Sequence, residues 1–503
     1  MKTIKIKFSI LAAVIFTLGA CTKNFEEINT NPNAATSISE DFLFSHSQTK
    51  TSTSGDFMYE NWRANLIYCE SMIQHIASIA GYWVGDKYFY NPGYSASLFD
   101  KAYTNELKDL IAVLDQTRDD PALVNKYAAA RIWKVVIFQR LTDLYGDIPY
   151  SEAGLGYDKQ IYKPAYDRQQ DIYMDMLNEL DQACSSFDAS KVTFGSADLV
   201  YGGDVDKWKR FGYSMMLRLG MRLSKVDPTT AQSWVQSAIS GGVMQSNDDN
   251  CFIQMADGPT DLNVNGNAKV FQVEFNPGGG EPRLSKTYVD FLKNNGDPRL
   301  RIYGELPDGN TDPAAQQGLP NGSDATTTPD VSIYTRPNIN TVGVLATPMY
   351  FQTYAEVEFM LAEAAVRGWG ASDPATHYNN GVTAAMLYVN TYANPAEPVT
   401  QAEVDAYLAA HPYDAAGDQL GQINTQYWAA TFLNGYEAFA NYRRSGYPLL
   451  TPVNYPGNVT NGTIPRRLQY PQSEYSNNPA GIAASLSNQG PDLLTTPVWW
   501  DKQ

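Results

Sequence analysis

The chain has 503 residues, of which 43% are hydrophobic and 18% charged, and its formal net charge is −17. A function on nucleic acid or on anionic lipid headgroups is disfavoured, because phosphate groups are repelled by an acidic surface. The length exceeds what one compact core usually holds and therefore predicts several domains or one extended helical-repeat domain.

The N-terminus has the pattern of a lipoprotein signal peptide. Three lysines precede an apolar run from Phe8 to Ala20, which is too short to span a bilayer and has the length of a signal-peptide core. The segment Leu18-Gly19-Ala20-Cys21 resembles the bacterial lipobox. It predicts that residues 1–20 are removed and that Cys21 is lipidated, with acyl chains such as palmitate as the membrane anchor. The alternative is a plain secretory signal.

Residues 21–40 are polar, rich in asparagine and interrupted by Pro32, which predicts an extended tether. The three remaining cysteines are Cys69, Cys184 and Cys251, and they form no CxxC pattern. At most one disulfide is possible, so the fold must be stabilised by an apolar core.

Helical periodicity dominates from about Asp41 to Gly241. Short polar, glycine or proline connections separate most of the segments, which favours antiparallel helix pairs stacked side by side. The predicted helices are Phe57–Ala80, Leu98–Gln116, Ala122–Tyr145, Gln169–Phe187, Trp208–Lys225 and Thr229–Ser240.

The helix within Ala128–Ala153 has a well-defined end. Gly146 stands where a C-terminal cap is expected, and Pro149 cannot continue the helix. The tail TDLYGDIPYSEA is similar to a signature of SusD/RagB outer-membrane lipoproteins. The apolar residues recur at steps of three and four and share one face; they are Trp133, Val136, Ile137, Leu141 and Leu144.

A second segment, DLVYGGDVDKWKRFGYSMMLRLGMRLS from Asp198, resembles the same family, with a two-glycine turn before a helix that opens on a tryptophan. Asp206 is the predicted N-cap of that helix. Arg218 and Arg222 are one turn apart on one face and therefore require acids opposite, which favours an internal ion-pair lock over a ligand-binding role.

Three further segments carry the resemblance, namely Thr353–Trp369, Gln426–Pro448 and the ending IPRRLQYPQSEYSNNP with TTPVWWDKQ. The chain is therefore identified as a member of the SusD/RagB family, nearest its SusD-like subgroup. The resemblance implies a mainly α fold, with one domain over residues 41–503. Four degenerate tetratricopeptide-like helix pairs would form its scaffold, and loops and a few short strands would carry the ligand.

The resemblance also implies a function. A lipoprotein of the outer membrane, facing the cell exterior, would capture a glycan or oligosaccharide and deliver it to a SusC-like TonB-dependent transporter. The alternatives are a peptide-binding, RagB-like protein and a glycoside hydrolase. The four histidines are scattered, and the sequence has no HExxH, GxSxG, P-loop or GxGxxG motif. Glu356 and Glu363 share a helix face about 10 Å apart, beyond the usual glycosidase separations, so no enzyme activity is predicted.

Binding residues are predicted in two loops. The loop Gly81–Tyr94, GYWVGDKYFYNPGY, carries six aromatic residues, and flat rings can stack on the apolar faces of sugars. The alternative is that these rings tuck under the loop or against the transporter. Loops such as Gly304–Asn338 help to line the pocket in SusD-like proteins. The predicted ligand-binding residues are Tyr82, Trp83, Tyr88, Tyr90 and Tyr94 from the first loop and Tyr334 and Arg336 from the second.

A partial calcium loop is present at Asp261, Asn263 and Asn265, which alternate and precede a glycine. The twelfth position is Gln272, where a bidentate glutamate is needed. A turn between two strands explains the same residues. No cofactor is otherwise predicted.

Overall fold

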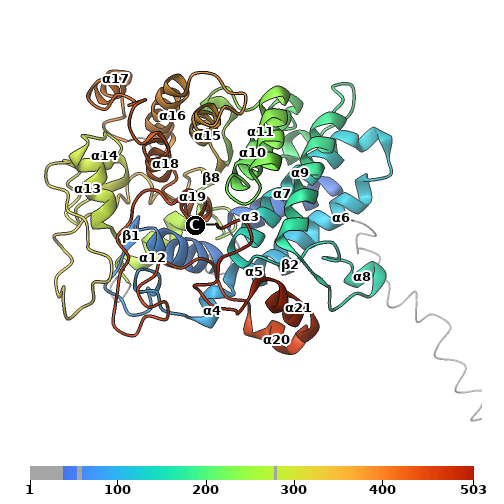
Figure 1. The fold of residues 1–503 in the computed structure, drawn as a ribbon, viewed down its shortest axis with the longest axis horizontal. Coiled ribbons are helices and arrows are strands. Elements are labelled where there is room, and N and C mark those ends of the chain that lie inside the picture. The colour runs from blue at the N-terminus through green and yellow to red at the C-terminus, as the bar shows by residue number, and fades with distance from the viewer. Residues whose placement is uncertain (1–37, 54–58, 277–279, 393–394, 503) are drawn as a thin grey trace, which may run out of the picture. The chain divides into compact units, whose positions relative to one another are not determined.

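The computed structural model describes residues 38–53, 59–276, 280–392 and 395–502. Glu40–Gln503 form one compact unit, which is mainly helical (Figure 1). The predicted signal peptide, Cys21 and most of the predicted tether lie outside the described residues. Within the described ranges, no helix combines the length and the apolar character that crossing a membrane requires.

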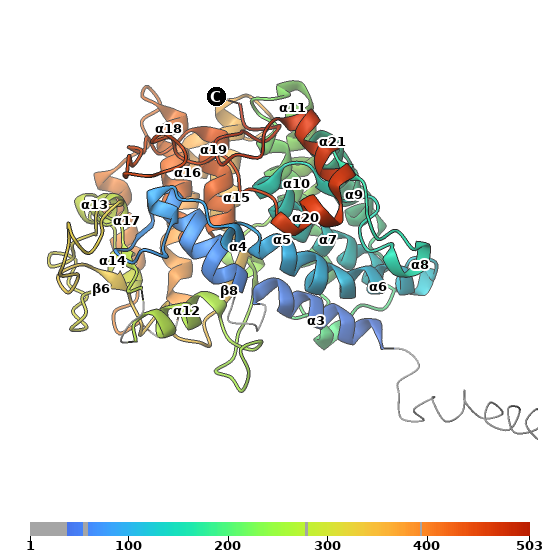
Figure 2. The ribbon, with the colours of Figure 1, turned by 90° about the horizontal axis from the view of Figure 1, so that it is seen from below.

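The first half of the unit is a series of packed helices, seen at one side of Figures 1 and 2. Each helix contacts the next: α3 with α6, α6 with α7, α7 with α9, α9 with α10, and α10 with α11. This arrangement confirms the predicted series of helix pairs. The helices are α3 Glu40–Ser52, α6 Leu107–Thr117, α7 Val124–Tyr145, α9 Gln169–Ser186, α10 Val205–Arg222 and α11 Pro228–Gly241.

The second half continues the pairing. Helix α15 packs against α16, α18 and α10, α18 packs against α19, and α16 packs against α17. Helix α19 returns to η1 near the start of the unit, so early and late parts of the chain share one core. The elements are η1 Asn61–Glu70, α15 Tyr354–Val366, α16 Pro374–Tyr388, α17 Gln401–Ala410, α18 Gln419–Ala430 and α19 Gly435–Ser445.

Short elements fill the connections. Four antiparallel strand pairs are present in the described chain: β1 Ile76–Ala77 with β5 Arg283–Leu284, β2 Ile148–Pro149 with β3 Tyr166–Asp167, β4 Cys251–Ile253 with β8 Met349–Gln352, and β6 Gly304–Glu305 with β7 Arg336–Pro337. The other helices are α4 Pro92–Ser95, α5 Ser97–Lys101, α8 Gly156–Lys159, α12 Gly266–Glu274, α13 Lys286–Asn294, α14 Leu300–Tyr303, α20 Gln472–Asn477 and α21 Pro479–Gln489, with the π-helix η3 Ala102–Glu106 and the 3₁₀ turns η2 Gly85–Lys87, η4 Pro121–Leu123, η5 Gly195–Ala197, η6 Asn247–Asp249 and η7 Val389–Thr391.

Helix α7 lies in the core of the first half. Its predicted apolar face is buried, with Trp133 and Leu141 at 0% exposure. The helix ends where the sequence predicts, because Gly146 adopts a φ of 80° and its N–H donates to the Thr142 carbonyl at 2.8 Å. The three cysteines are buried and unbonded to one another.

The two-glycine turn before α10 is organised by Asp198. Its Oδ2 accepts hydrogen bonds from Trp208 Nε1 at 2.6 Å and from the Gly203 N–H at 2.9 Å, which fixes the turn against the tryptophan that opens the helix. The N-cap prediction was wrong by two residues. Asp204, rather than Asp206, caps the helix, since its side chain accepts from the Asp206 and Lys207 N–H groups.

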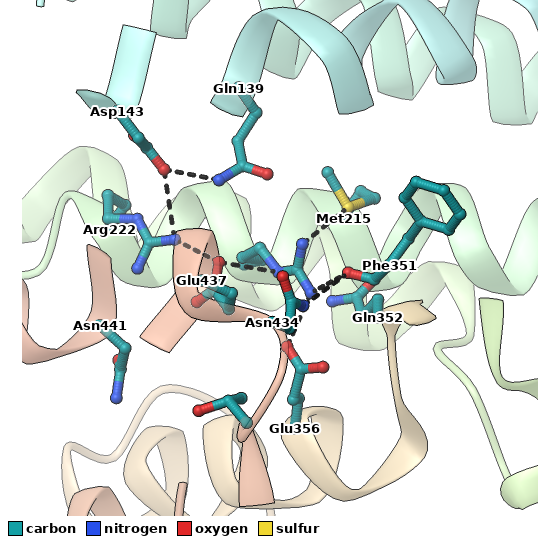
Figure 3. A network of polar contacts seen from close by, with 12 residues as sticks. Gln139, Asp143, Met215, Arg222, Phe351, Gln352, Glu356, Asn434, Glu437 and Asn441 are labelled. Carbon is teal, nitrogen blue, oxygen red and sulfur yellow. Dashed lines mark hydrogen bonds and ion pairs between the residues drawn. The ribbon is translucent and has the colours of Figure 1, made fainter. Parts of the chain in front are cut away.

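Arg218 and Arg222 form the predicted internal ion-pair lock. Figure 3 shows Arg222 with its partners Glu437 and Asp143. Arg218 Nη2 lies 2.7 Å from Glu356 Oε2, and Arg222 Nη2 lies 2.7 Å from Glu437 Oε2. Burial favours the neutral acid, but the charges of Arg222 and Arg218 lower the pKa of Glu437. Asp143 of α7 lies 3.4 Å from Arg222 Nη2, so the network joins α7, α10, α15 and α19.

Two predicted elements differ from the structure. The predicted helix Phe57–Ala80 contains a π-helix, η1, and its end pairs as strand β1 with β5. The Asn-Gly step at Asn265 starts helix α12 rather than a turn between strands. Its side chain accepts from the Asn267 and Ala268 N–H groups, and this capping decides for a helix.

Candidate functional site

The side chain of Arg63 lies among aromatic rings at the start of η1. Its guanidinium carbon is 3.4 Å from the ring centroid of Tyr59, 5.2 Å from that of Tyr94 and 6.0 Å from that of Trp62. Arg63 is half-buried, and its Nη1 is covered and has no hydrogen-bond partner among the described residues. A ligand oxygen that reached this group would supply the hydrogen bond that Nη1 lacks.

Tyr82 extends this cluster to helix α12. Its hydroxyl donates to Glu274 Oε2 at 2.5 Å, and Glu274 is fully buried. Burial, and then the hydrogen bond to Glu274, raise the pKa of Tyr82. Burial also raises the pKa of Tyr94, with the charge of Arg63 opposing and that of Glu274 adding to the shift. We call Tyr59, Trp62, Arg63, Tyr82, Tyr94 and Glu274 the Arg63 cluster.

Two predicted platform residues belong to the core instead. Trp83 is 1% exposed and Tyr88 is 0% exposed, so neither ring has a face open to a ligand. A Cβ built on Gly280 would lie 2.4 Å from Trp83 Nε1, which shows how closely the chain covers the indole. The structure therefore corrects the prediction for Trp83 and Tyr88, because a segment distant in sequence covers the loop.

Tyr90 points towards another part of the unit. It is half-buried, and its hydroxyl accepts a hydrogen bond from Gln472 Nε2 of α20 at 3.1 Å. Of the five predicted aromatic residues of the first loop, the structure thus brings Tyr82 and Tyr94 together, while a role for Tyr90 in binding stays a prediction.

The carboxylate of Asp86, in a buried ion pair of the first loop, also contacts the second loop. Asp86 Oδ1 lies 3.0 Å from Lys87 Nζ, and Asp86 Oδ2 accepts from the Gly322 N–H at 3.1 Å. Asn321 Nδ2 donates to the Ile76 carbonyl at 2.8 Å. Burial raises the pKa of Asp86, although Lys87 opposes the shift. The second loop is therefore fixed against the first.

Arg336 of the second loop pairs with Glu305, which lines a polar cavity. It lies 2.8 Å from Glu305 Oε1, and its guanidinium carbon is 5.2 Å from the ring centroid of Phe275, next to Glu274. Tyr334 is half-buried two residues earlier. The cavity has a volume of about 350 Å³, which lies at the lower end of the range of ligand pockets. Its polar lining includes Arg301, Glu305, Thr311, Asn338, Asn340 and Thr341.

The oxygens of the predicted calcium loop serve separate partners. Asp261 lies 3.5 Å from Lys269 Nζ, Asn263 Oδ1 accepts from the Thr260 hydroxyl at 2.6 Å, and Asn265 caps α12. Across the described ranges, no group of three or more histidine, cysteine, aspartate or glutamate side chains could hold a metal. Calcium binding at these residues stays a prediction.

Tyr59, Trp62 and Arg63 were not among the binding residues predicted from the sequence. In the segment YENWR, Trp62 and Arg63 follow Tyr59 by three and four residues, which places the three side chains on neighbouring helical turns. This spacing could have indicated that they lie close together. Glu274 gives no such signal, because only the tertiary structure brings α12 to Tyr82. A π-helix such as η1 is also often found at functional sites, but periodicity does not distinguish it from an α-helix.

The scaffold of helix pairs carries tyrosine rings on the first loop, the guanidinium of Arg63 on η1, and a polar cavity. These groups suit a ligand with flat apolar faces and many hydroxyls. The family model described as "Starch-binding associating with outer membrane" matches residues 32–471. The chain belongs to this SusD-like family.

Solved structures agree with this assignment. A structure titled as a chitin-binding protein is 34% identical, with a TM-score of 0.83, and the match covers 92% of this chain and 100% of that one. A Bacteroidetes SusD-like protein is 27% identical, with a TM-score of 0.81 and coverage of 93% and 100%. A chitin-binding SusD homolog from Flavobacterium johnsoniae shares the fold at 24% identity, with a TM-score of 0.78 and coverage of 92% and 98%. No curated protein matches the chain.

Proposed function

We propose that the protein captures an oligosaccharide at the Arg63 cluster and delivers it to a SusC-like TonB-dependent transporter of the outer membrane. The observation that carries the proposal is the guanidinium of Arg63, which lies between the rings of Tyr59 and Tyr94 and whose Nη1 has no hydrogen-bond partner among the described residues. Rings of this kind stack on the apolar faces of sugars, while a guanidinium donates several hydrogen bonds to hydroxyl or acetamido oxygens.

The relatives support a glycan as the ligand. The family description names starch binding, and the 34% identical structure is titled as chitin-binding. Chito-oligosaccharides and malto-oligosaccharides are therefore the first ligands to test. The protein would bind and release its ligand without a covalent step.

The membrane attachment and the transporter are further parts of the proposal. The family description includes association with the outer membrane, and the lipobox-like segment ends at Cys21. Acyl chains on Cys21 would anchor the protein at the cell exterior beside the transporter. The acidic net charge of −17 opposes binding to nucleic acid.

Isothermal titration tests the ligand site. The mature chain from Thr22 is titrated with chitohexaose, maltohexaose and a panel of peptides, and the titrations are repeated with Arg63→Ala. We expect saturable binding to a glycan that weakens about tenfold in Arg63→Ala, since a hydrogen bond to a charged group contributes roughly 1.5–3 kcal/mol. The matched control is Arg118→Ala, because Arg118 is an exposed arginine paired with Asp115.

Two results would contradict the proposal. Binding to peptides alone would assign the protein to the peptide-binding alternative. Equal glycan affinity in Arg63→Ala and in the parent would show that the glycan does not bind at the Arg63 cluster.

A further inference from the structure

A second hollow lies between helices α13, α16, α17 and α18. Figures 1 and 2 show these helices on the same side of the unit. The hollow has a volume of about 620 Å³, which is within the range of ligand-binding clefts. We call it the α17–α18 groove.

Aromatic side chains line much of the groove. Tyr378 and Tyr407 are buried at its base, and the rings of Tyr407 and His411 are 4.7 Å apart. Tyr447 lies at its side, and Leu449 at its rim is 85% exposed. The half-buried rings of His411 and Tyr447 and the exposed Leu449 favour a ligand that has apolar surfaces of its own.

The described lining of the groove contains no lysine or arginine. Its polar groups are carboxylates, amides, the hydroxyls of threonine and tyrosine, and the imidazole of His411. Asp414 and Thr425 line the groove, and Asp414 Oδ1 accepts from the Ala416 N–H at 2.9 Å. Such a lining disfavours anions and offers acceptors to a neutral ligand rich in hydroxyl groups.

The walls of the groove are held in place before any ligand binds. The Asp414 N–H donates to Gln422 Oε1 at 2.8 Å, and Gln422 Nε2 donates back to the Asp414 carbonyl at 3.0 Å. His411 Nε2 donates to the Asn295 carbonyl at 2.8 Å, which ties the end of α17 to the end of α13. A preformed groove loses little conformational entropy on binding.

We propose that the α17–α18 groove is a second binding site, for a neutral oligosaccharide segment. This second site is inferred from the residues that line the groove and is separate from the Arg63 cluster. The inference rests on the proposed function only for the choice of glycans as probes. Two sites on one protein would hold a polymer at two places, which raises its overall affinity without any new contact at the first site.

Hydrogen–deuterium exchange locates binding at each site separately. The mature chain is measured with and without saturating chitohexaose or maltohexaose. We expect slower exchange in residues 405–427, which include the groove, as well as in residues 79–94 of the first loop. In Arg63→Ala, protection of 405–427 should persist while protection of 79–94 is lost.

Variants of the groove provide the reverse test. Tyr447→Ala removes a ring from the side of the groove, and Thr425→Lys places a long charged side chain inside the groove. The second variant provides the test if the first one does not fold. Both should lose protection of 405–427 and keep that of 79–94. The matched control is Tyr162→Ala, since Tyr162 is 77% exposed and does not line the groove.

The outcomes separate the two proposals. Protection of 79–94 alone, in the parent with either glycan, overturns the groove and leaves the proposed function intact. Protection of 405–427 that survives in both groove variants also overturns it, because binding then does not use the groove. Absence of protection at both segments with both glycans overturns the groove proposal together with the glycan assignment.

Discussion

Glu363 and Arg444 form a two-pronged ion pair inside the helical scaffold. Nη1 to Oε1 and Nη2 to Oε2 are both 2.7 Å, and both side chains are almost fully buried. Arg367 lies 2.8 Å from the same carboxylate, and Asn424 donates to it at 3.1 Å. One glutamate therefore holds α15, α18 and α19 together.

Replacing this glutamate should destabilise the protein strongly at neutral pH. Glu363→Gln leaves the buried Arg444 without its counter-charge, which costs about 3–5 kcal/mol of unfolding free energy. Urea unfolding followed by circular dichroism measures the loss. The control is Glu397→Gln, because Glu397 is exposed; an equal loss in both variants would contradict the assignment.

The same pair predicts a dependence on acid. Burial favours the neutral acid, but Arg444 and Arg367 hold the pKa of Glu363 at about 2, below its ordinary value of 4.5. The stabilisation is therefore present above pH 4.5 and is lost as the pH falls towards 2. The difference in unfolding free energy between parent and Glu363→Gln should narrow below pH 4.5, and a constant difference would disprove the pairing.

Glu106 should give the stability of the protein the opposite dependence on pH. Burial and the nearby Glu60 carboxylate raise its pKa to about 8 from 4.5. The folded state therefore holds a proton that the unfolded state releases, so stability is highest below pH 4.5 and is lost as the pH rises to 8. Glu106→Gln should be more stable than the parent at pH 8.5, by on the order of 3–5 kcal/mol, and nearly equal to it at pH 4. Thermal unfolding across this pH range measures the effect, and parallel pH profiles for the two proteins would refute it.

Trp83 and Tyr82 should respond differently to truncation. Trp83→Ala opens a cavity in the core and should lower the free energy of unfolding by about 3–5 kcal/mol. Tyr82→Ala removes a half-buried ring of the Arg63 cluster and should weaken glycan binding by about 1 kcal/mol, roughly fivefold. Denaturant unfolding and titration calorimetry on both variants distinguish the roles. A fully stable Trp83→Ala variant that no longer binds glycan would restore the ring-platform prediction.

The contact of Asp86 with the second loop can be tested by amide hydrogen exchange. Asp86→Ala removes the acceptor of the Gly322 N–H and leaves Lys87 buried without its counter-charge. We expect faster amide exchange at residues 319–323 and a loss of about 3 kcal/mol in stability. Asp308→Ala, in an exposed part of the same loop, is the control. Unchanged exchange at Gly322 would show that the loops are held by other contacts.

Local sequence signals determined much of the scaffold. The end of α7 at Gly146 could be predicted, because the capping of a helix depends on the residues next to its end. The spacing of Arg218 and Arg222 predicted buried acids opposite, since two like charges on one covered face require counter-charges. The family resemblance likewise rests on contiguous segments, and the family model confirms it over residues 32–471.

The site depended on contacts between distant segments. The sequence does not distinguish the six aromatic residues of the first loop, because their exposure depends on which other segments pack on them. The chain at Gly280 covers Trp83, whereas the hydroxyl of Tyr82 contacts Glu274. Nothing local indicates that Arg63 Nη1 lacks a hydrogen-bond partner among the described residues, because pairing is a property of the assembled fold. Local sequence patterns therefore determined most of the helices and the end of α7, while tertiary packing alone decided which rings and charges remain accessible to a ligand.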